Sequence, residues 1–330
     1  MKVIIPVAGA GAKLRPFTYT QPKCLIPLAG KTILSFIVDE LIEAGANDFI
    51  FIIGHLGEKI KDYVIEKYPQ INAQFVVQLE RDGTGHAVFL AKDLVAENEE
   101  IVIVFGDTIC DNQIKNIVDN PHSCFGIKKV DDPRNFGVVE LDHNGKALHV
   151  IEKPTVPKSN MALVGIYKIK ESKLLFAILN DGIAKNILSE KYQLTNAIDS
   201  MIQKNVQFDT FIVDNWYDCG KKESLLNTNA NILKKLEFAS DEVPFFDNTI
   251  IIHPVSIADG CNIQNSIIGP NVTIGENATI ESSIISDSII GSYSELNKVV
   301  LHKSLIGSDA FVKGYSQSLN IGDNTEIDLQ

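Results

Sequence analysis

The last third of the chain repeats a short pattern that few folds can accommodate. Ile-Gly pairs begin at Ile274, Ile290, Ile306 and Ile321, and an aliphatic residue recurs every five or six positions within these steps. Three such intervals per repeat are typical of a three-sided parallel β-helix, whose inward aliphatic side chains stack from coil to coil. Gly and Asn after the aliphatic residue suit its tight corners. A Gly-rich antiparallel sandwich is the alternative, but it does not explain why several repeats keep one phase.

Short apolar runs alternate with segments of helical period in the first two-thirds of the chain. The predicted strands are Lys2–Val7, Phe49–Ile53, Ala73–Gln78, Ile101–Phe105 and Phe125–Lys129, and the predicted helices are Ile33–Ala44 and Glu58–Tyr68. This alternation predicts an α/β fold with a mostly parallel sheet covered on both faces. Ligands of such sheets bind beyond the carboxyl ends of the strands, so the loops that follow the strands are the candidate sites.

The two patterns meet in a charged, proline-containing stretch. We expect a first domain over residues 1–235, a linker over 236–247 and a β-helix over 248–330. A length of 330 residues, about twice the usual ~150-residue domain, agrees with two domains. Because the flat sides of a β-helix often pack on copies of themselves, we also expect a homo-oligomer.

The composition restricts the partners and the compartment. A formal net charge of −12, without a basic cluster, opposes nucleic-acid binding. No stretch approaches the ~20 apolar residues of a membrane span, and the N-terminal segment lacks a signal-peptide cleavage pattern. The five cysteines are widely separated and form no C-x-x-C pair, so neither disulfides nor a thiolate zinc site is predicted. We therefore expect a soluble, cytoplasmic protein without nucleic-acid or membrane partners.

A loop of small residues, Ala8–Pro16, follows the first predicted strand. Such a loop lets backbone N–H groups approach a phosphate chain, and Lys13 and Arg15 add positive charge beside it. The loop does not fit a dinucleotide fingerprint, because Leu14 stands where the third glycine is required. Taken alone, a turn of small residues serves close packing as readily as phosphate binding.

The segment around this loop resembles the signature of the sugar-nucleotide pyrophosphorylases, also called sugar-1-phosphate nucleotidyltransferases. The matching positions are Gly9, Gly11, Leu14, Arg15, Pro16, Thr18, Pro22, Lys23, Leu25 and Pro27. Ala8, Ala12 and Lys13 depart, standing where Gly, Thr and Arg are usual; Lys13 keeps the charge but not the bidentate fork of Arg. The resemblance runs from about Lys2 to Asn231. It implies a Rossmann-like nucleotidyltransferase domain, with a left-handed β-helix of hexapeptide repeats as its known companion.

Gln78 and the Gly83-Thr84-Gly85-His86-Ala87 motif resemble the family's base-reading region. The nucleotide-binding residues implied by the resemblance are Ala8, Gly9, Gly11, Gln78, Gly83 and Thr84. A Gln amide can offer a donor and an acceptor to a pyrimidine edge, which favours uracil or thymine over a purine. The alternative for Gln78 is an ordinary surface amide. We interpret His86 as a helix-start or packing residue.

Two aspartates follow strand-like segments far apart in the sequence. Asp107 comes after the run that ends at Phe105, and Asp218 stands within Trp216-Tyr217-Asp218-Cys219-Gly220. Carboxylates from separate strands commonly hold Mg²⁺, which takes its other ligands from phosphate and water, whereas an isolated Asp before a turn is more often a cap. The resemblance implies that Asp107 and Asp218 bind Mg²⁺.

Four residues match the sugar side of the family's pattern. By resemblance, Gly137 supplies backbone contacts to the sugar, Glu152 binds its hydroxyls, Lys153 approaches its phosphate, and Tyr167 lies near the sugar pocket. Without the resemblance, the Glu-Lys-Pro motif over residues 152–154 would be a solvated pair before a turn.

The resemblance implies a transfer reaction between two phosphate compounds. The phosphate oxygen of a sugar 1-phosphate, with glucose 1-phosphate favoured, attacks the α-phosphorus of dTTP or UTP, and pyrophosphate leaves. Lys13 and Arg15 would hold the leaving phosphates, Lys23 would screen the incoming phosphate, and these three residues with Asp107 are the expected catalytic set.

Two alternatives remain open at this point. Ala12 and Lys13 suggest a non-catalytic regulatory or nucleotide-sugar-binding relative. Acetyltransferase activity in the β-helix is a further possibility, but His253 and His302, the histidines of that region, have no evident partner in the sequence. A structural or oligomer-forming role for the β-helix is favoured instead.

Overall fold

The computed structural model describes the chain except for residues 81, 111–113, 186–191, 237–243 and 316–330. The chain divides into two compact units, one made of Met1–Ile26 and Lys31–Thr228 and the other of Pro27–Gly30 and Asn229–Gln330. The boundary at Thr228 lies inside helix α7 (Lys222–Lys235). Much of the predicted linker, residues 237–243, lies outside the described residues. No helix of the described residues is long and apolar enough to cross a membrane.

The first unit contains a nine-stranded sheet in which seven strands follow the order β10-β9-β11-β6-β1-β4-β5, while β8 pairs with β11 and β12. Its strands are β1 (Lys2–Pro6), β4 (Asp48–Ile53), β5 (Asn72–Val77), β6 (Ile101–Val104), β8 (Cys124–Lys129), β9 (Gly137–Leu141), β10 (Ala147–Glu152), β11 (Met161–Ile169) and β12 (Asp209–Ile212). Each strand and helix predicted from the sequence is present, and its ends agree to within one residue.

The sheet is parallel around β1 and antiparallel around β11. β1 pairs in parallel with β4 and β6, and β4 with β5, as the alternation of strands and helices predicts. β11 runs antiparallel to β6, β8 and β9, which the sequence did not indicate. Its nine residues are almost all apolar because both faces of the strand are covered. Such a run gives no sign of whether the neighbouring strands are parallel or antiparallel to it.

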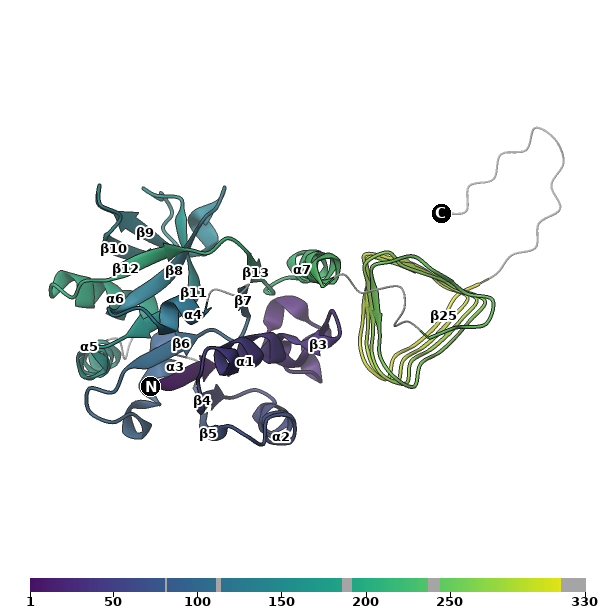
Figure 1. Ribbon diagram of the computed structural model, residues 1–330, viewed down its shortest axis with the longest axis horizontal. Coiled ribbons are helices and arrows are strands. Elements are labelled where there is room, and N and C mark those ends of the chain that lie inside the picture. Colours follow the sequence, from purple (N-terminus) through teal and green to yellow (C-terminus); the bar gives the residue numbers. More distant parts are fainter. Residues whose placement is uncertain (81, 111–113, 186–191, 237–243, 316–330) are drawn as a thin grey trace. The chain divides into compact units, whose positions relative to one another are not determined.

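Helices cover both faces of this sheet (Figure 1). On one face, Ile4, Ile50 and Ile103 join a core that includes side chains of α3 (Thr84–Phe89), α5 (Ser172–Lys185) and α6 (Leu194–Gln203). The alternate residues, such as Val3 and Phe51, are also buried. α2 (Gly57–Lys67) contacts β4 and β5, and α4 (Ile114–Val118) contacts α1 (Ile33–Glu43), β8 and β11. The carboxyl ends of the strands are thus held by a sheet buried on both sides.

Short elements complete the first 32 residues and the site. They are η1 (Ala12–Leu14), η2 (Phe17–Tyr19), η3 (Lys23–Leu25), β2 (Pro27–Leu28), β3 (Lys31–Thr32), η4 (Lys92–Leu94), β7 (Thr108–Cys110), η5 (Pro133–Asn135) and β13 (Trp216–Asp218).

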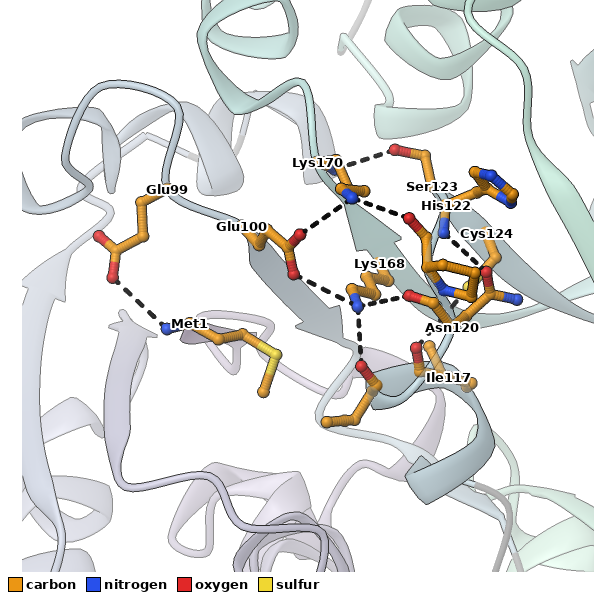
Figure 2. Close-up of polar contacts among 12 residues, drawn as sticks. Met1, Glu99, Glu100, Ile117, Asn120, His122, Ser123, Cys124, Lys168 and Lys170 are labelled. Carbon is orange, nitrogen blue, oxygen red and sulfur yellow. Dashed lines mark hydrogen bonds and ion pairs between the residues drawn. The ribbon is translucent and has the colours of Figure 1, made fainter.

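A buried lysine fixes the end of α4 against the sheet. Lys168 on β11 is 4% exposed, and its Nζ donates to the carbonyl oxygens of Val118, at 2.7 Å, and Asn120, at 2.6 Å. The Nζ also lies 3.3 Å from the carboxylate of Glu100, which Lys170 approaches to the same distance (Figure 2). A cation at the C-terminal end of a helix satisfies carbonyl groups that have no partner within the helix.

The second unit contains the predicted three-sided parallel β-helix, left-handed and built of hexapeptide repeats. Figure 1 shows its coils as stacked triangles. Its three sheets are β14 (Ile250–Ile251), β17 (Ile267–Ile268), β20 (Ile284–Ser286) and β23 (Val300–His302); β15 (Val255–Ile257), β18 (Val272–Ile274), β21 (Ile289–Ile290) and β24 (Leu305–Ile306); and β16 (Asn262–Gln264), β19 (Thr279–Glu281), β22 (Glu295–Asn297) and β25 (Phe311–Lys313). Every pairing among these strands is parallel.

The coils turn at residues with a left-handed backbone. Positive φ angles recur every five or six positions, at Asn265, Asn271, Asn277, Ser282, Asp287, Tyr293, Lys298, Lys303 and Asp309. Asn at the corners was predicted, whereas Tyr293 and Lys298 are residues that rarely adopt this conformation. Hydrogen bonds between coils hold them there, because the N–H of Tyr293 donates to Glu276 and that of Lys298 to Glu281.

Candidate active site

Two adjoining cavities open where the central strands end. The first cavity, of about 350 Å³, is lined by residues that directly follow strands, including Val7 after β1, Gln78 after β5 and Phe105 after β6. The second cavity, of about 630 Å³, extends beneath β7, β9 and β13. The residues that line both cavities are Lys23, Thr84, Phe105, Asp107 and Gln193. The cavities therefore share a wall at the carboxyl edge of the sheet, where the fold class predicts a ligand.

Two glycines of the loop after β1, Gly9 and Gly11, have different structural roles. A Cβ atom at Gly9, in the first cavity, would meet no protein atom within 4 Å, so packing does not account for this glycine. A Cβ at Gly11 would lie 2.9 Å from Thr18 Cγ2, and its φ is +59°. Gly11 thus shapes the loop, while Gly9 leaves its backbone open to a ligand.

Gln78 is not the surface amide that the sequence left as an alternative. Its side chain lines the first cavity and the residue is only 7% exposed. Its Nε2 donates to the carbonyl oxygen of Gly83, at 3.3 Å, and lies 3.2 Å from Nδ1 of His86. Ala8, Gly9, Gly83 and Thr84 line the same cavity, so five of the six predicted nucleotide-binding residues surround one space.

Gln193 was not predicted from the sequence, although it lines both cavities. Its Oε1 accepts hydrogen bonds from Thr84, at 3.0 Å from Oγ1 and 3.4 Å from the backbone nitrogen. The segment that carries Gln193 precedes α6 and also bonds through its backbone to the first turn of α3, since Gly85 N donates to Tyr192 O at 3.0 Å. No motif marks this position, because an amide before a helix is common.

A lysine and an aspartate meet at the shared wall, and a second aspartate lies near them in the second cavity. Lys23 Nζ, carried by η3, lies 2.5 Å from Oδ2 of Asp107. β7 pairs antiparallel with β13, which places Thr108 opposite Asp218 and brings both predicted carboxylates to the second cavity. The Oδ1 of Asp218 accepts from the Gly220 N–H at 2.9 Å. The structure therefore joins residues that are about a hundred positions apart.

The charges of this cluster act on one another. Burial raises the pKa of Asp218, the negative charge of Asp107 raises it further, and Lys23 acts in the opposite direction. Burial alone would lower the pKa of Lys23, but the two aspartates raise it, so the ammonium stays charged. Two carboxylates that repel each other in a partly buried place favour a cation between them.

The donor set fits a magnesium ion that is completed by substrate. Within the described part of the chain, no three His, Cys, Asp or Glu side chains are grouped as a metal site. Asp107 and Asp218 offer carboxylate oxygens, the ligands that Mg²⁺ prefers, and this ion usually takes its other ligands from phosphate and water. A pair of carboxylates beside a cavity meets that requirement.

The far side of the second cavity contains the predicted sugar-side residues. Glu152 Oε1 lies 2.9 Å from Lys153 Nζ, and Glu152 Oε2 accepts from Thr195 Oγ1 at 3.1 Å. Glu152, Lys153 and Gly137 all line the cavity, so the Glu-Lys pair is more than a solvated pair before a turn. Thr195, at the start of α6, was not predicted.

Two aromatic residues form part of the same wall. Tyr167 is 1% exposed and packs against Phe105 and Phe125, with ring centres 5.7 and 6.3 Å apart. Most of the side chain therefore belongs to the core. Burial raises the pKa of Tyr167, so its hydroxyl stays protonated. Trp216, which the sequence did not single out, lines the cavity and stacks edge-on with Phe136 at 4.9 Å.

The two basic residues of the first loop lie in different places. Lys13 is exposed and lines the second cavity. Arg15 lines neither cavity; its guanidinium carbon lies 5.1 Å from the ring centre of Tyr19. The other predicted site residues each line at least one cavity. Arg15 is thus the one that the structure separates from the rest.

Comparison with known sequences and structures agrees with this arrangement. The nucleotidyl transferase family model matches residues 2–235, and the model of the GlmU-like C-terminal hexapeptide matches residues 235–326. The low-salt glycan biosynthesis nucleotidyltransferase Agl11 of Haloferax volcanii is 30% identical, with all of both chains covered. A bifunctional protein GlmU of Methanococcus vannielii is 32% identical over 94% of this chain and 78% of the relative.

A solved structure shows the same fold. The crystal structure of a putative glucose-1-phosphate thymidylyltransferase from Bacillus anthracis in complex with a sucrose superposes with a TM-score of 0.62 at 25% identity, covering 74% of this chain and 97% of the other. Since the family model spans most of the sequence and the relatives align along its length, the chain belongs to the nucleotidyl transferase family, among the sugar-1-phosphate nucleotidyltransferases that the sequence resembles.

Proposed function

We propose that the protein condenses dTTP or UTP with a sugar 1-phosphate, preferentially glucose 1-phosphate, and releases pyrophosphate. The observation that carries this proposal is the Lys23–Asp107 pair at the wall between two cavities, with Asp218 near it in the second cavity. The first cavity would hold the nucleoside, the second the sugar, and the reacting phosphates would meet at the shared wall. A relative named as a glucose-1-phosphate thymidylyltransferase supports the substrate pair.

The nucleotide would enter beside the loop after β1. The open backbone at Gly9 would receive the phosphate chain, and Gln78 would face the base in the first cavity. Lys13 would bind the leaving phosphates from the second cavity. Arg15 would bind these phosphates only after its side chain moves away from the ring of Tyr19. We therefore propose a smaller contribution of Arg15 to phosphate binding than the sequence suggested.

The sugar 1-phosphate would occupy the second cavity. Glu152, held by Thr195, would accept hydrogen bonds from sugar hydroxyls, and Lys153 would bind the sugar phosphate. Gly137 would contribute its backbone, and the indole of Trp216 would pack against the sugar ring. The enzyme's main task is to hold two anions in line and neutralise their charge.

Asp107 and Asp218 would hold Mg²⁺, which supplies positive charge to the triphosphate when it is bound. Lys23 now lies against Asp107 and would move toward the incoming phosphate once the carboxylate has another cation. Loss of one such electrostatic contact reduces turnover by about 10²–10³.

The test is a matrix of nucleoside triphosphates against sugar 1-phosphates in the presence of Mg²⁺, scored by pyrophosphate release. Asp107→Ala should abolish release while circular dichroism stays unchanged. Asp62→Asn, on the exposed side of α2, is the matched control and should behave as the parent. Near-normal turnover of the Asp107 variant would refute the role of this carboxylate.

A non-catalytic relative is the second candidate, favoured by the position of Arg15. It would bind nucleotide in calorimetry yet release no pyrophosphate with any pair of substrates. The complete cluster around Lys23 argues against it. Acyl transfer in the β-helix gains no support, because the Nδ1 of His302 faces both Ser286 Oγ at 3.0 Å and Asp287 Oδ2 at 3.5 Å. These partners of His302 were not evident in the sequence. In a proton relay, the hydroxyl and the carboxylate would have to contact opposite nitrogens of the imidazole ring, whereas both contact Nδ1 here.

We further propose that the protein forms a homo-oligomer through one side of the β-helix. The register of β14, β17, β20 and β23 aligns Ile250, Ile267, Ile284 and Val300 in a column, which we call the apolar column. Ile250, Ile284 and Val300 are 59%, 46% and 77% exposed. Light scattering of the full chain should show an oligomer that Val300→Lys dissociates, while Glu295→Lys on another sheet leaves it intact. A monomeric parent would refute this proposal.

We place the protein in the cytoplasm. Among the described residues no disulfide joins the cysteines, which is the state that a reducing compartment maintains.

A further inference from the structure

We infer that His86 is a positioning residue: it fixes the orientation of the Gln78 amide and so makes Gln78 a hydrogen-bond acceptor toward the nucleobase. This inference rests on the proposed function, because it takes the first cavity as the place of the base. It goes beyond the interpretation of His86 as a helix-start or packing residue and narrows the expectation that Gln78 offers both a donor and an acceptor.

The first step is the identity of the amide atom that faces Gly83. The terminal amide of Gln has two ends, and only its nitrogen can donate. One end lies 3.3 Å from the carbonyl oxygen of Gly83, which can only accept, so this end is Nε2. The same carbonyl also accepts from the backbone N–H of Ala87 at 3.2 Å, so both of its lone pairs are used.

The second step concerns His86. The Nε2 of Gln78 also lies 3.2 Å from Nδ1 of His86. An amide nitrogen cannot accept a hydrogen bond, so Nδ1 must accept, and the imidazole is the neutral tautomer with its proton on Nε2. Both hydrogens of the Gln78 amide are then used within the protein. Its Oε1 is the atom left to contact a ligand in the first cavity.

Hydrogen bonds and close packing hold the loop that carries Gly83 and the first turn of α3, which carries His86. Gly83 has a φ of +100°, and a Cβ on it would lie 2.3 Å from the carbonyl oxygen of Tyr192. The N–H of Tyr192 donates to Asp82 O at 2.9 Å, and that of Gly85 to Tyr192 O at 3.0 Å. Gly83 and His86 therefore keep their places without the ligand, and the amide is oriented before a base arrives.

The consequence is a chemical selection among bases. An acceptor at Oε1 pairs with the N3–H of uracil or thymine, whereas cytosine presents a bare N3 that would repel it. Without an acceptor at position 86, the amide loses one of the two contacts that define its orientation. It then turns more easily and offers its NH₂ to the base.

The experiment compares UTP and CTP as substrates with glucose 1-phosphate for the parent, His86→Leu and His86→Asn. Leu removes the acceptor, and Asn restores one because its Oδ1 can occupy the place of Nδ1. Loss of one hydrogen bond predicts that His86→Leu raises KM for UTP by about fivefold to tenfold and lowers the preference for UTP over CTP by a similar factor, with kcat unchanged. His86→Asn should recover most of both. His122→Leu, at an exposed histidine of the same unit, is the matched control.

The outcomes separate three cases. If His86→Leu keeps the parent's KM and base preference, or loses kcat alone, the inference is wrong. If Leu and Asn variants are impaired alike, His86 acts by packing, and the inference is also wrong. If the parent releases pyrophosphate with no triphosphate, the proposed function fails, and calorimetric binding of UTP and CTP to the three proteins still decides the role of His86: equal base preference in all of them refutes it.

Discussion

Replacing Lys168 by Met should destabilise the first unit by about 3 kcal/mol. The Met side chain keeps most of the apolar stem but leaves the carbonyl oxygens of Val118 and Asn120 without the charged donor that they now have at 2.7 and 2.6 Å. Hydrogen bonds to a charged group contribute about 1.5–3 kcal/mol each, and the return of a buried ammonium to water offsets part of that sum. The ion pair with Glu100, whose side chain is 38% exposed, adds less than about 1 kcal/mol.

Lys170→Met is a matched control, since Lys170 also lies 3.3 Å from Glu100 and donates to the carbonyl oxygen of Pro121 at 2.8 Å, but its side chain is 39% exposed, so water can replace these contacts. We expect it to cost at most about 1 kcal/mol. Urea unfolding followed by fluorescence isolates the first unit, because Trp216 is the single tryptophan of the chain. In thermal unfolding, the Lys168 variant should lose about 6–12 °C, from the 2–4 °C per kcal/mol of a unit this size. Equal shifts for the two variants would refute the reasoning.

The stability difference between the parent and Lys168→Met should also depend on pH. Burial opposes the charge of Glu100, but Lys168 and then Lys170 outweigh this effect and lower the pKa of Glu100 from 4.5. A carboxyl with a lowered pKa in the folded state stabilises that state above the unfolded pKa, and this contribution disappears as the pH falls through the folded value. The difference between the parent and Lys168→Met should therefore narrow below pH 4.5.

Three further predictions concern the site. Asp218→Asn should lose activity yet melt at a higher temperature than the parent at neutral pH, because burial and then Asp107 raise the Asp218 pKa and make its ionised form costly to the fold. In calorimetry, the difference in melting temperature between the two proteins should disappear below pH 3.8. A lower melting temperature of the variant at pH 7 would contradict the assignment. Gly9→Ala should raise KM for the triphosphate about tenfold or more without changing the melting temperature, whereas Gly11→Ala should destabilise the fold, since only the latter Cβ meets protein atoms; matched kinetics and thermal scans distinguish the two. Lys23→Met should reduce kcat by about 10²–10³ in a pyrophosphate-release assay, and turnover within twofold of the parent would remove Lys23 from the mechanism.

The sequence predicted the elements whose physical cause is local. The β-helix follows from periodicity alone, since an aliphatic residue must point inward on each side of every coil, and the core includes Ile263, Ile274, Ile280, Ile290 and Leu296 at that spacing. The strands around β1 follow from their alternation with helices. The direction of β11 does not, because a strand buried on both faces carries no polar alternation to reveal its neighbours.

The site was predictable where a motif or a strand end marked it. Asp107 and Gln78 follow strands, and their placement at one edge was expected. Gln193 and Thr195 reach the cavities only through tertiary packing, and nothing in their neighbours along the chain marks them. Trp216 was within reach of the prediction, because it stands two residues before Asp218. The orientation of the Gln78 amide depends on the carbonyl of Gly83, just before α3, and on His86 in that helix, a level of detail that residue types alone do not contain.

The stacked register of the β-helix restricts how such a chain can change its length. Each strand lies directly over its counterpart 16 or 17 residues later, as Ile250 does over Ile267 and Ile284 over Val300. A change of one residue between coils is absorbed where the chain turns, because coils of 16 and of 17 residues stack in the same register. A larger change keeps the strands paired only when a whole coil is added or removed, so homologues should differ in this unit mainly by complete coils.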